Sequence, residues 1–375
     1  MVRSVQHEML ATPDHDEAAR QQFVVAVKQH LNRSLRPANR RAFDEQAAPA
    51  WEREHGRPPE NRREIREAML ANRHYRTWST LARSAQELMW DSLADTLARE
   101  RPRLEATAHR IMADPPRGGS LDLDPAFEVP RGMAKVEVHL QPGGYALDLG
   151  PDDVLAGAYY ESGGNLYAFG QGIGRRDSKA AHVQGFLRDR YPDLELRRIL
   201  DMGCSAGSAT VPYALEFPEA EVHGIDVGAG MLRYAHARAE ALGARVRFHQ
   251  MDVAATRFPD GHFDLIVSHN MMHEVSDRTR RGAMRESFRL LRPGGVCIHQ
   301  DVPLRFEGLD EFRKFDLSWD ALYNNEPFWE VYATADLRSD LEAAGFPPEE
   351  VHTGHLPQRQ GSLPWYVGTA RKPVA

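Results

Sequence analysis

The chain has 375 residues, of which 42% are hydrophobic and 27% are charged, and its formal net charge is −7. These values are ordinary for globular proteins, and the length allows one large domain with additions or two domains. A negative net charge gives no global electrostatic support for binding nucleic acid or an anionic membrane. We find no run of about 18 apolar residues and no apolar signal-peptide core, so we expect a cytoplasmic protein without a membrane partner. The two cysteines, Cys204 and Cys297, are expected to be reduced packing residues rather than a disulfide.

Residues 1–115 are predicted to form an N-terminal helical domain. Apolar residues recur at helical spacing over residues 14–35. That helical face carries four apolar side chains: Phe23, Val24, Val27 and Leu31. A second helix is predicted over residues 40–55, and Asn61 opens one broken helix or two helices that reach about Met112. Arginines alternate with glutamates here, which is typical of a solvated, ion-paired surface. The region has no catalytic motif, and we expect it to cover a substrate, to form a homodimer interface, or both.

Residues 116–175 are predicted to bridge the helical domain to the rest of the chain. Apolar and polar residues alternate over 135–140, and a Pro-Gly-Gly turn separates them from residues 145–149, which predicts a small β-hairpin. An aromatic segment at 159–174 precedes a helix predicted over 179–191. Four side chains are candidates either to cover a ligand or to pack between domains: Tyr159, Tyr160, Tyr167 and Phe169.

The most informative stretch is residues 197–210. Ile199 and Leu200 predict a buried strand that ends at Asp201, and a glycine turn then leads into a helix from about Ala209. Glycine lets the backbone turn sharply, and a helix start offers unpaired N–H groups. We therefore expect a pocket for a polar, partly anionic ligand at the carboxyl edge of the strand. The acid, glycines and small residues of this D-x-G-x-x-x-G turn are Asp201, Gly203, Cys204, Ser205 and Gly207.

Further strands follow at regular intervals. The strand over 221–227 ends at Asp226, 25 residues after Asp201, which is one strand–helix–strand step. An acid at such a tip can accept hydrogen bonds from both ribose hydroxyls. Three more strands are predicted near 246–253, 264–267 and 296–299. A helix over 333–345 precedes a closing pair of strands at 350–355 and 365–370.

Together these motifs resemble the class I S-adenosylmethionine-dependent methyltransferases, and most of all the ubiquinone/menaquinone type. The resemblance covers about residues 178–375, although many members carry glycine where this chain has Ser205. It implies an α/β, Rossmann-like methyltransferase sheet over residues 176–375, mostly parallel with a closing antiparallel hairpin. It also implies S-adenosylmethionine as the cofactor and a small organic acceptor as the substrate.

The resemblance also implies which residues would contact the cofactor. Its amino-acid end would lie against Asp201, Gly203, Ser205 and Gly207, its ribose against Asp226, and its adenine against Asp252. His269 and Asn270 would lie beside the methionine part. The remaining residues expected at the cofactor are Tyr167, Cys204, Val227, Met231, Met251 and Val253.

Candidate catalytic residues follow the fourth and fifth strands. The resemblance points His273 toward the acceptor, where a histidine of near-neutral pKa could accept a proton, and a structural role for His273 is the alternative. His299 and Asp301 are further candidates. His269 and His273 do not follow the H-E-x-x-H pattern, so we expect no metal site.

The segment after the fifth strand is rich in aromatic residues. These indicate either an apolar, planar acceptor or packing against the N-terminal helices. They are Phe306, Phe312, Phe315, Trp319, Tyr323, Phe328, Trp329 and Tyr332.

Two other functions fit parts of this pattern. A nicotinamide-dependent oxidoreductase shares a similar sheet, but the missing third glycine and the closing hairpin disfavour it. A non-catalytic protein that keeps the cofactor pocket as a scaffold is the second alternative.

Overall fold

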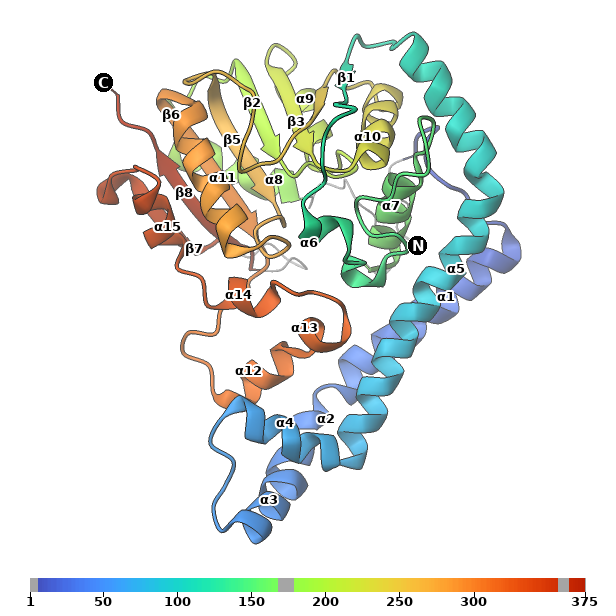
Figure 1. Ribbon diagram of the computed structural model, residues 1–375, viewed down its shortest axis with the longest axis vertical. Helices are drawn as coiled ribbons and strands as arrows, with labels where there is room; N and C mark the ends of the chain where they lie inside the picture. The colour runs from blue at the N-terminus through green and yellow to red at the C-terminus, as the bar shows by residue number, and fades with distance from the viewer. Residues whose placement is uncertain (1–5, 168–178, 357–363, 375) are drawn as a thin grey trace.

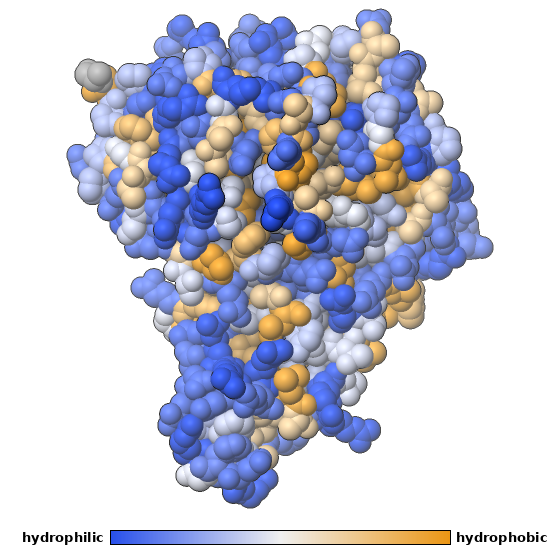
Figure 2. All heavy atoms as spheres, viewed as in Figure 1, coloured by the Kyte–Doolittle hydropathy of each residue, from blue (hydrophilic) through white to orange (hydrophobic). Residues whose placement is uncertain are grey.

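The computed structural model describes residues 6–167, 179–356 and 364–374. An α/β body contains one eight-stranded sheet with helices on both faces, and a helical arm extends away from it (Figure 1). The visible face is largely hydrophilic, with hydrophobic residues in small separate spots (Figure 2). The described residues contain no helix long and apolar enough to cross a membrane.

The strand order is β1-β4-β3-β2-β5-β6-β8-β7. All neighbouring pairs are parallel except β6 with β8 and β7 with β8, which are antiparallel. The strands are β1 (Ser120–Asp122), β2 (Arg198–Met202), β3 (Glu221–Asp226), β4 (Arg247–Gln250), β5 (Phe263–His269), β6 (Leu291–Asp301), β7 (Val351–His355) and β8 (Tyr366–Arg371). This arrangement confirms the predicted mostly parallel sheet and its closing hairpin. The strand order reverses between β2 and β5, and ligands bind at the carboxyl end of such a switch point.

Side chains that alternate along the strands form two apolar cores. Leu200 and Ile266 face a core that includes residues of α11 (Asp277–Leu290) and α15 (Leu337–Ala343). Ile199 and Leu265 face the other core, with residues of α8 (Lys179–Arg190), α9 (Thr210–Glu216) and α10 (Ala229–Ala241). All seven residues of β5 are buried, which is typical of a central parallel strand covered on both faces. Both cysteines are free and buried, as predicted.

The bridging segment differs from the prediction. It contains the short strand β1, which pairs parallel with β4, and then α6 (Arg131–Ala134), η3 (Val138–Leu140) and α7 (Leu155–Tyr167). The predicted hairpin over 135–149 is wrong. His139 and Leu140 have φ of 55° and 63°, so the chain turns where a strand would extend. The alternating pattern arises because Val138 and Leu140 are buried within this turn.

The segment before β1 is helical, and its helices fall close to the ranges predicted for them. It contains α1 (His15–His30), η1 (Leu31–Leu35), α2 (Ala38–Ala42), η2 (Phe43–Ala47), α3 (Ala48–His55), α4 (Arg62–Ala71) and α5 (Arg73–Ala113). Gly56 ends α3 with φ of 75°, and the Asn61 side chain caps α4 by accepting from the amides of Arg63 and Glu64. Of the four apolar side chains assigned to one helical face, Val24 and Leu31 are buried, whereas Phe23 is 62% exposed.

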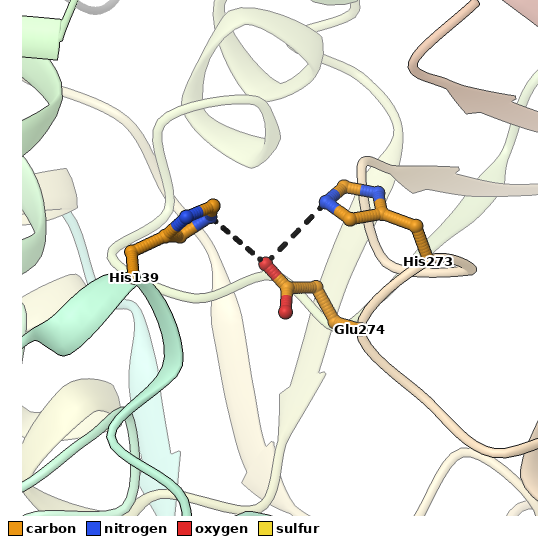
Figure 3. A group of neighbouring side chains, drawn as sticks. All are labelled: His139, His273 and Glu274. Atoms are coloured by element: carbon orange, nitrogen blue, oxygen red, sulfur yellow. Dashed lines mark ion pairs between the residues drawn. The ribbon is translucent and has the colours of Figure 1, made fainter. Parts of the chain in front are cut away.

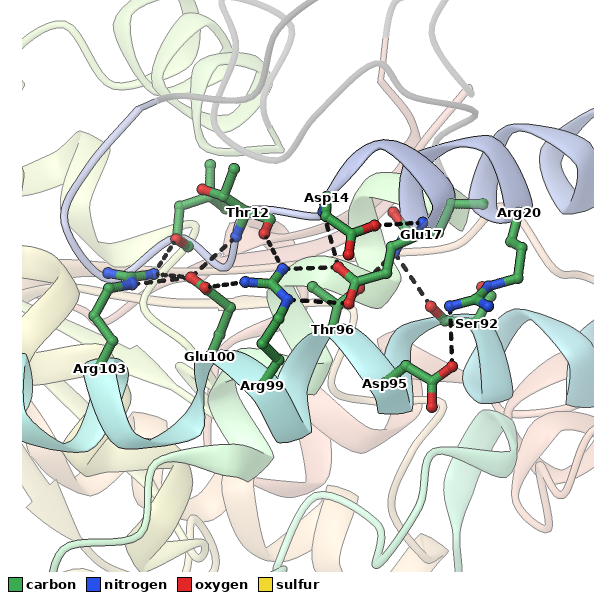
Figure 4. Close-up of polar contacts among 12 residues, drawn as sticks. Thr12, Asp14, Glu17, Arg20, Ser92, Asp95, Thr96, Arg99, Glu100 and Arg103 are labelled. Atoms are coloured by element: carbon green, nitrogen blue, oxygen red, sulfur yellow. Dashed lines mark hydrogen bonds and ion pairs between the residues drawn. The ribbon is translucent and has the colours of Figure 1, made fainter.

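Ion pairs join α1 to α5, as Figure 4 shows. Arg99 of α5 donates to Glu17 of α1 from Nη2 to Oε2 at 2.7 Å, and Arg20 of α1 donates to Asp95 of α5 from Nη2 to Oδ2 at 3.0 Å. The hydrogen bonds from Arg99 lower the pKa of Glu17 to about 2. The alternating charges therefore connect two helices in addition to covering a solvated surface.

Aromatic residues join the arm to the segment that follows β6. Phe312 and Phe315 of α12 (Glu311–Leu317) and Trp319 of α13 (Trp319–Tyr323) pack with Tyr75 and Trp78 of the arm. The Trp319 indole donates to the Ser79 hydroxyl at 2.8 Å. Phe306, Trp329 and Tyr332 lie in or against the core beside α11. Packing therefore accounts for most of this aromatic segment.

A buried ion pair links α7 to α10. Arg238 Nε donates to Glu161 Oε1 at 3.0 Å, and each of these two side chains is 2% exposed. Tyr234 also donates to Glu161, at 2.6 Å. Burial alone would raise the pKa of Glu161, but Arg238 and the neighbouring donors lower it to about 2.

Replacing Glu161 with Gln is expected to lower the free energy of unfolding by about 3–5 kcal/mol, because it leaves Arg238 buried without a counter-charge. Urea unfolding measures this change. The matched control is Glu216→Gln, which removes an ion pair to Arg188 whose side chains are 51% and 57% exposed. The control should change stability by no more than about 0.5 kcal/mol. Equal effects of the two variants would contradict the prediction.

Candidate functional site

A cavity of about 570 Å³ opens at the carboxyl edge of the sheet. This volume suits a small ligand or cofactor. The wall includes residues that follow β2, β3, β4 and β5, together with the bridging segment and the start of α11. Eight of the predicted cofactor residues line it: Gly203, Ser205, Asp226, Val227, Asp252, Val253, His269 and Asn270.

The turn after β2 has the backbone conformation that its glycines allow. Gly203 and Gly207 have φ of 71° and 72°, and Ser205 has φ of 43°. A Cβ on Gly203 would lie 2.6 Å from Cγ of Met271, so a side chain there would clash as well as strain the backbone. Ser205 also has a positive φ, a region that glycine adopts without strain.

Asp201 is buried at the end of β2 beside this turn. Its Oδ2 accepts from the Thr210 hydroxyl at 2.6 Å, and its Oδ1 has no hydrogen-bond partner among the described residues. Burial raises the pKa of Asp201 to about 7. A buried carboxylate oxygen without a donor is costly, so this atom fits a ligand that brings an N–H group. Asp201 itself does not line the cavity, whereas Gly203 and Ser205 of the turn that follows it do.

Asp226 and Asp252 lie at the tips of the next two strands. The Asp226 carboxylate accepts from the amide of Ser205 at 3.0 Å and from the amide of Gly228 at 3.1 Å. Burial raises the pKa of Asp226. Asp252 accepts from the amide of Ala254 at 2.8 Å. Backbone donors thus fix both carboxylates, and each retains lone pairs for a ligand.

His269 is the last residue of β5, and Asn270 follows it. His269 has Nδ1 2.7 Å from Oε1 of Gln300 and Nε2 3.1 Å from the Tyr213 hydroxyl. Burial lowers the pKa of His269 to about 4, so the ring is neutral at physiological pH. Asn270 has φ of 55°, and its Oδ1 is buried without a hydrogen-bond partner among the described residues. That oxygen is a second acceptor atom available to a ligand.

Several predicted cofactor residues do not line the cavity. Cys204, Met231 and Met251 pack in the apolar cores, and Gly207 shapes the turn through its backbone. Tyr167 is partly buried, and Gln86 and Asn324 both donate to its hydroxyl. Phe169 lies outside the described residues. The predicted aromatic cover is represented on the cavity wall by Tyr160.

His299, a predicted base candidate, lies inside the core. The hydroxyls of Ser268 and Ser287 lie 2.9 Å and 3.2 Å from its two ring nitrogens. Burial lowers the pKa of His299 to about 3. Its side chain does not line the cavity, and both ring nitrogens already have serine partners, so His299 is not placed to accept a proton from an acceptor there.

Asp301 and His273 form a buried pair. Asp301 Oδ1 lies 2.5 Å from Nδ1 of His273, and Asp301 Oδ2 accepts from the amide of Met272 at 2.8 Å. Nε2 of His273 lies 3.4 Å from Oε1 of Glu274. Burial opposes protonation, but the two carboxylates raise the pKa of His273 well above its usual value. This geometry favours an anchored imidazolium over a free base. The rings of His269 and His273 bond to different groups, Gln300 and Tyr213 for His269 and Asp301 for His273.

Several wall residues and one neighbour of the wall were not identified from the sequence. Tyr145, Glu274, Arg278 and Arg285 line the cavity, together with Phe328, which the sequence had indicated as a possible acceptor contact. His139 lies behind Glu274, with Nε2 3.3 Å from Oε1 of that carboxylate. Glu274 follows the candidate base His273 directly in the chain, and this position could have identified it as a site residue. The position of His139 depends on the turn at 138–140, and no motif marks it.

Comparisons with known proteins agree with this geometry. Residues 199–295 match the family model described as methyltransferase domain. The demethylmenaquinone methyltransferase of Thermus thermophilus is 36% identical over 120 residues, which cover 31% of this chain and 54% of that protein. The trans-aconitate 2-methyltransferase of Deinococcus radiodurans is 29% identical over 215 residues, which cover 53% of this chain and 78% of that protein.

Solved structures are similar at a lower level. The phosphoethanolamine N-methyltransferase 2 of Haemonchus contortus, in complex with phosphomonomethylethanolamine and S-adenosylhomocysteine, has a TM-score of 0.43 and 18% identity. The match covers 57% of this chain and 58% of that chain. The strand order, the D-x-G-x-x-x-G turn and the family match over residues 199–295 support one assignment. Residues 199–295 belong to the methyltransferase domain family, of the S-adenosylmethionine-dependent class, and the chain spans about half the length of the Thermus relative.

Proposed function

We propose that this protein transfers a methyl group from S-adenosylmethionine to a small organic acceptor with an apolar or aromatic face. One observation carries the proposal: acids and small residues from adjacent strand tips surround a single cavity. Asp226 and Asp252 line it, and the unpartnered oxygen of Asp201 lies at the end of β2 beside it.

The residues present fit the cofactor. Oδ1 of Asp201 and Oδ1 of Asn270 are buried acceptors that the ammonium end of the cofactor would satisfy. Asp226 would hold the ribose hydroxyls, and Asp252 with Val253 would hold the adenine. S-adenosylmethionine supplies an electrophilic methyl group on a sulfonium, so the protein need not activate it further.

The remaining wall supports an acceptor with an apolar face. Its apolar and aromatic side chains are Met133, Tyr145, Tyr160, Met271, Val275 and Phe328. These residues would orient the acceptor and exclude water from the reacting atoms. Glu274 is the carboxylate on this side, and His273 with Asp301 would act as positioning residues behind it. The names of two relatives, demethylmenaquinone methyltransferase and trans-aconitate 2-methyltransferase, point to different acceptors. We therefore infer the chemical class of the acceptor from the apolar residues of the cavity wall.

Two expectations about the whole protein stay predictions. A homodimer through residues 1–115 would place the helical arm at an interface between copies. A cytoplasmic location would supply the reducing conditions that free Cys204 and Cys297 require.

Calorimetric titration with S-adenosylhomocysteine and with NAD separates methyl transfer from the rival oxidoreductase function. We expect saturable binding of S-adenosylhomocysteine and much weaker binding of NAD, because the cavity offers a D-x-G-x-x-x-G turn without the third dinucleotide glycine. Preferential binding of NAD would overturn the proposal. Turnover of labelled S-adenosylmethionine with any acceptor would then exclude a non-catalytic scaffold.

The variant Asp226→Ala is expected to weaken S-adenosylhomocysteine binding by about 1–3 kcal/mol, because two ribose hydroxyls lose their acceptor. Calorimetry on folded protein measures the change. The matched control is Asp260→Ala, since Asp260 is 80% exposed and pairs with Arg289 away from the cavity wall. Unchanged affinity in the Asp226 variant would refute the ribose assignment.

Binding of S-adenosylhomocysteine is expected to strengthen as the pH rises through about 7, the value to which burial raises the pKa of Asp201. Below that pH the carboxyl must lose a proton to accept the ligand ammonium, so affinity should fall by up to about tenfold per pH unit. Asp226 and Lys179 are the other charged groups that act on Asp201. Titrations at several pH values test this, with Asp201→Asn as the control. If the affinity of the Asp201→Asn variant changed with pH by the same slope, a group other than Asp201 would be the cause of the pH dependence.

A further inference from the structure

Three side chains from two distant segments converge behind the acceptor side of the cavity. His139 belongs to the bridging segment, and His273 and Glu274 lie in the loop between β5 and α11. Nε2 of His139 and Nε2 of His273 lie 3.3 Å and 3.4 Å from Oε1 of Glu274. One ligand atom from each residue lies within 4.8 Å of the other two. Figure 3 shows both rings pointing toward the Glu274 carboxylate.

Each imidazole is held on its far side by another carboxylate. Nδ1 of His139 lies 2.9 Å from Oε1 of Glu326, and Nδ1 of His273 lies 2.5 Å from Oδ1 of Asp301. Both of these carboxylate side chains are almost fully buried. A histidine that binds a metal through one nitrogen nearly always donates its other N–H to such a partner, which fixes the tautomer and the ring. Here both rings have that support, and both present Nε2 to the same point.

The protein holds His139 in an unfavourable backbone conformation. Its φ is 55°, in the left-handed region that non-glycine residues seldom adopt. Its carbonyl accepts from Nε2 of Gln86 and from Nε1 of Trp90, at 2.7 Å in each case. Two donors from the long helix α5 therefore stabilise the turn that directs the ring toward Glu274. Strain of this kind persists at sites where a side chain must be placed accurately.

We propose that His139, His273 and Glu274 bind a divalent transition-metal ion. Two donors bound at about 2.1 Å to one tetrahedral ion lie about 3.4 Å apart, which matches the distances from each Nε2 to Oε1 of Glu274. Two imidazoles with one carboxylate suit Zn²⁺, Fe²⁺, Co²⁺ or Mn²⁺, whereas Mg²⁺ and Ca²⁺ prefer oxygen ligands. Three protein ligands also leave coordination positions for water or for an acceptor oxygen.

The proposed metal site adjoins the methyl-transfer cavity without depending on it. Glu274 and Tyr145 line the cavity, and the Tyr145 hydroxyl donates to Oε1 of Glu274 at 3.2 Å. The ligand atoms are arranged by contacts outside the proposed cofactor region. Metal binding can therefore be measured on protein that has never met a methyl donor, and its failure would leave the cofactor assignment intact.

Chelator-treated full-length protein at neutral pH, titrated with Zn²⁺ by calorimetry, is expected to bind one equivalent, and Mg²⁺ at the same concentration should not compete. Co²⁺ should bind in place of Zn²⁺ and give the visible absorption of an ion with nitrogen and oxygen ligands. Absence of saturable Zn²⁺ binding would overturn the proposal, and the cluster would then be an ion-pair network of two imidazolium rings and their carboxylates.

Variants locate the site. His139→Asn keeps a residue that tolerates the left-handed conformation and removes the imidazole. The single variants His139→Asn and Glu274→Gln each remove one proposed metal ligand, and each should weaken Zn²⁺ binding by more than about 100-fold. Loss of a residue that only supports a ligand typically lowers metal affinity 10–100-fold. The variant Glu326→Gln tests whether Glu326 supports the His139 ring, and it should weaken Zn²⁺ binding about 10-fold. The matched control is His109→Asn, whose side chain is 74% exposed on α5. Unchanged affinity in both ligand variants, or equal losses in the control, would assign the bound Zn²⁺ to another site.

Discussion

Parallel alignment of β2, β3, β4 and β5 is the constraint on which the rest of the site depends. Their carboxyl ends meet at one edge of the sheet, and the strand order reverses between β2 and β5. The backbone after β2 must then turn sharply to reach α9. Left-handed conformations at Gly203, Ser205 and Gly207 make this turn, and the Ser205 amide reaches across to Asp226. The same bond that closes the turn therefore fixes the carboxylate of the neighbouring strand, and two strand tips act as one binding surface.

The helical arm contributes to the site through packing rather than through side chains that line the cavity. Trp78 packs against Trp319 with ring centroids 5.6 Å apart, which ties the arm to the segment after β6. That segment carries Glu326, while α5 of the arm holds the backbone of His139. The long helix and the inserted helices thus bring two halves of a buried cluster together. Loosening the contact between Trp78 and Trp319 would separate those halves, although neither aromatic ring touches a reacting group.

The sequence was most informative where local rules determine structure. The Asp201 turn and the acids at strand ends predicted the sheet and a ligand site at one edge of it, because strand ends in a parallel sheet share an edge. The resemblance to methyltransferases added the cofactor residues, of which eight line the cavity wall. The sequence was least informative where distant segments meet. His139 could not be found, since its position depends on a left-handed turn that α5 stabilises from 49 residues away in the chain. The aromatic residues after β6 looked like an acceptor pocket, yet Phe312 and Phe315 mostly serve the contact with the arm. Composition alone cannot distinguish these two uses of an aromatic side chain.

Charge explains why the buried cluster can exist in two forms. The carboxylates of Glu274, Glu326 and Asp301 face two imidazoles, and burying three negative charges without compensation would be prohibitive. Protonation of both His139 and His273 supplies two positive charges, and the neighbouring carboxylates accordingly raise the pKa of each ring well above its usual value. A divalent ion on neutral rings supplies the same charge, so exchanging two protons for one metal ion leaves the net charge of the cluster unchanged. The protein can therefore keep one arrangement of side chains in both states, and metal binding needs little rearrangement of the surrounding core.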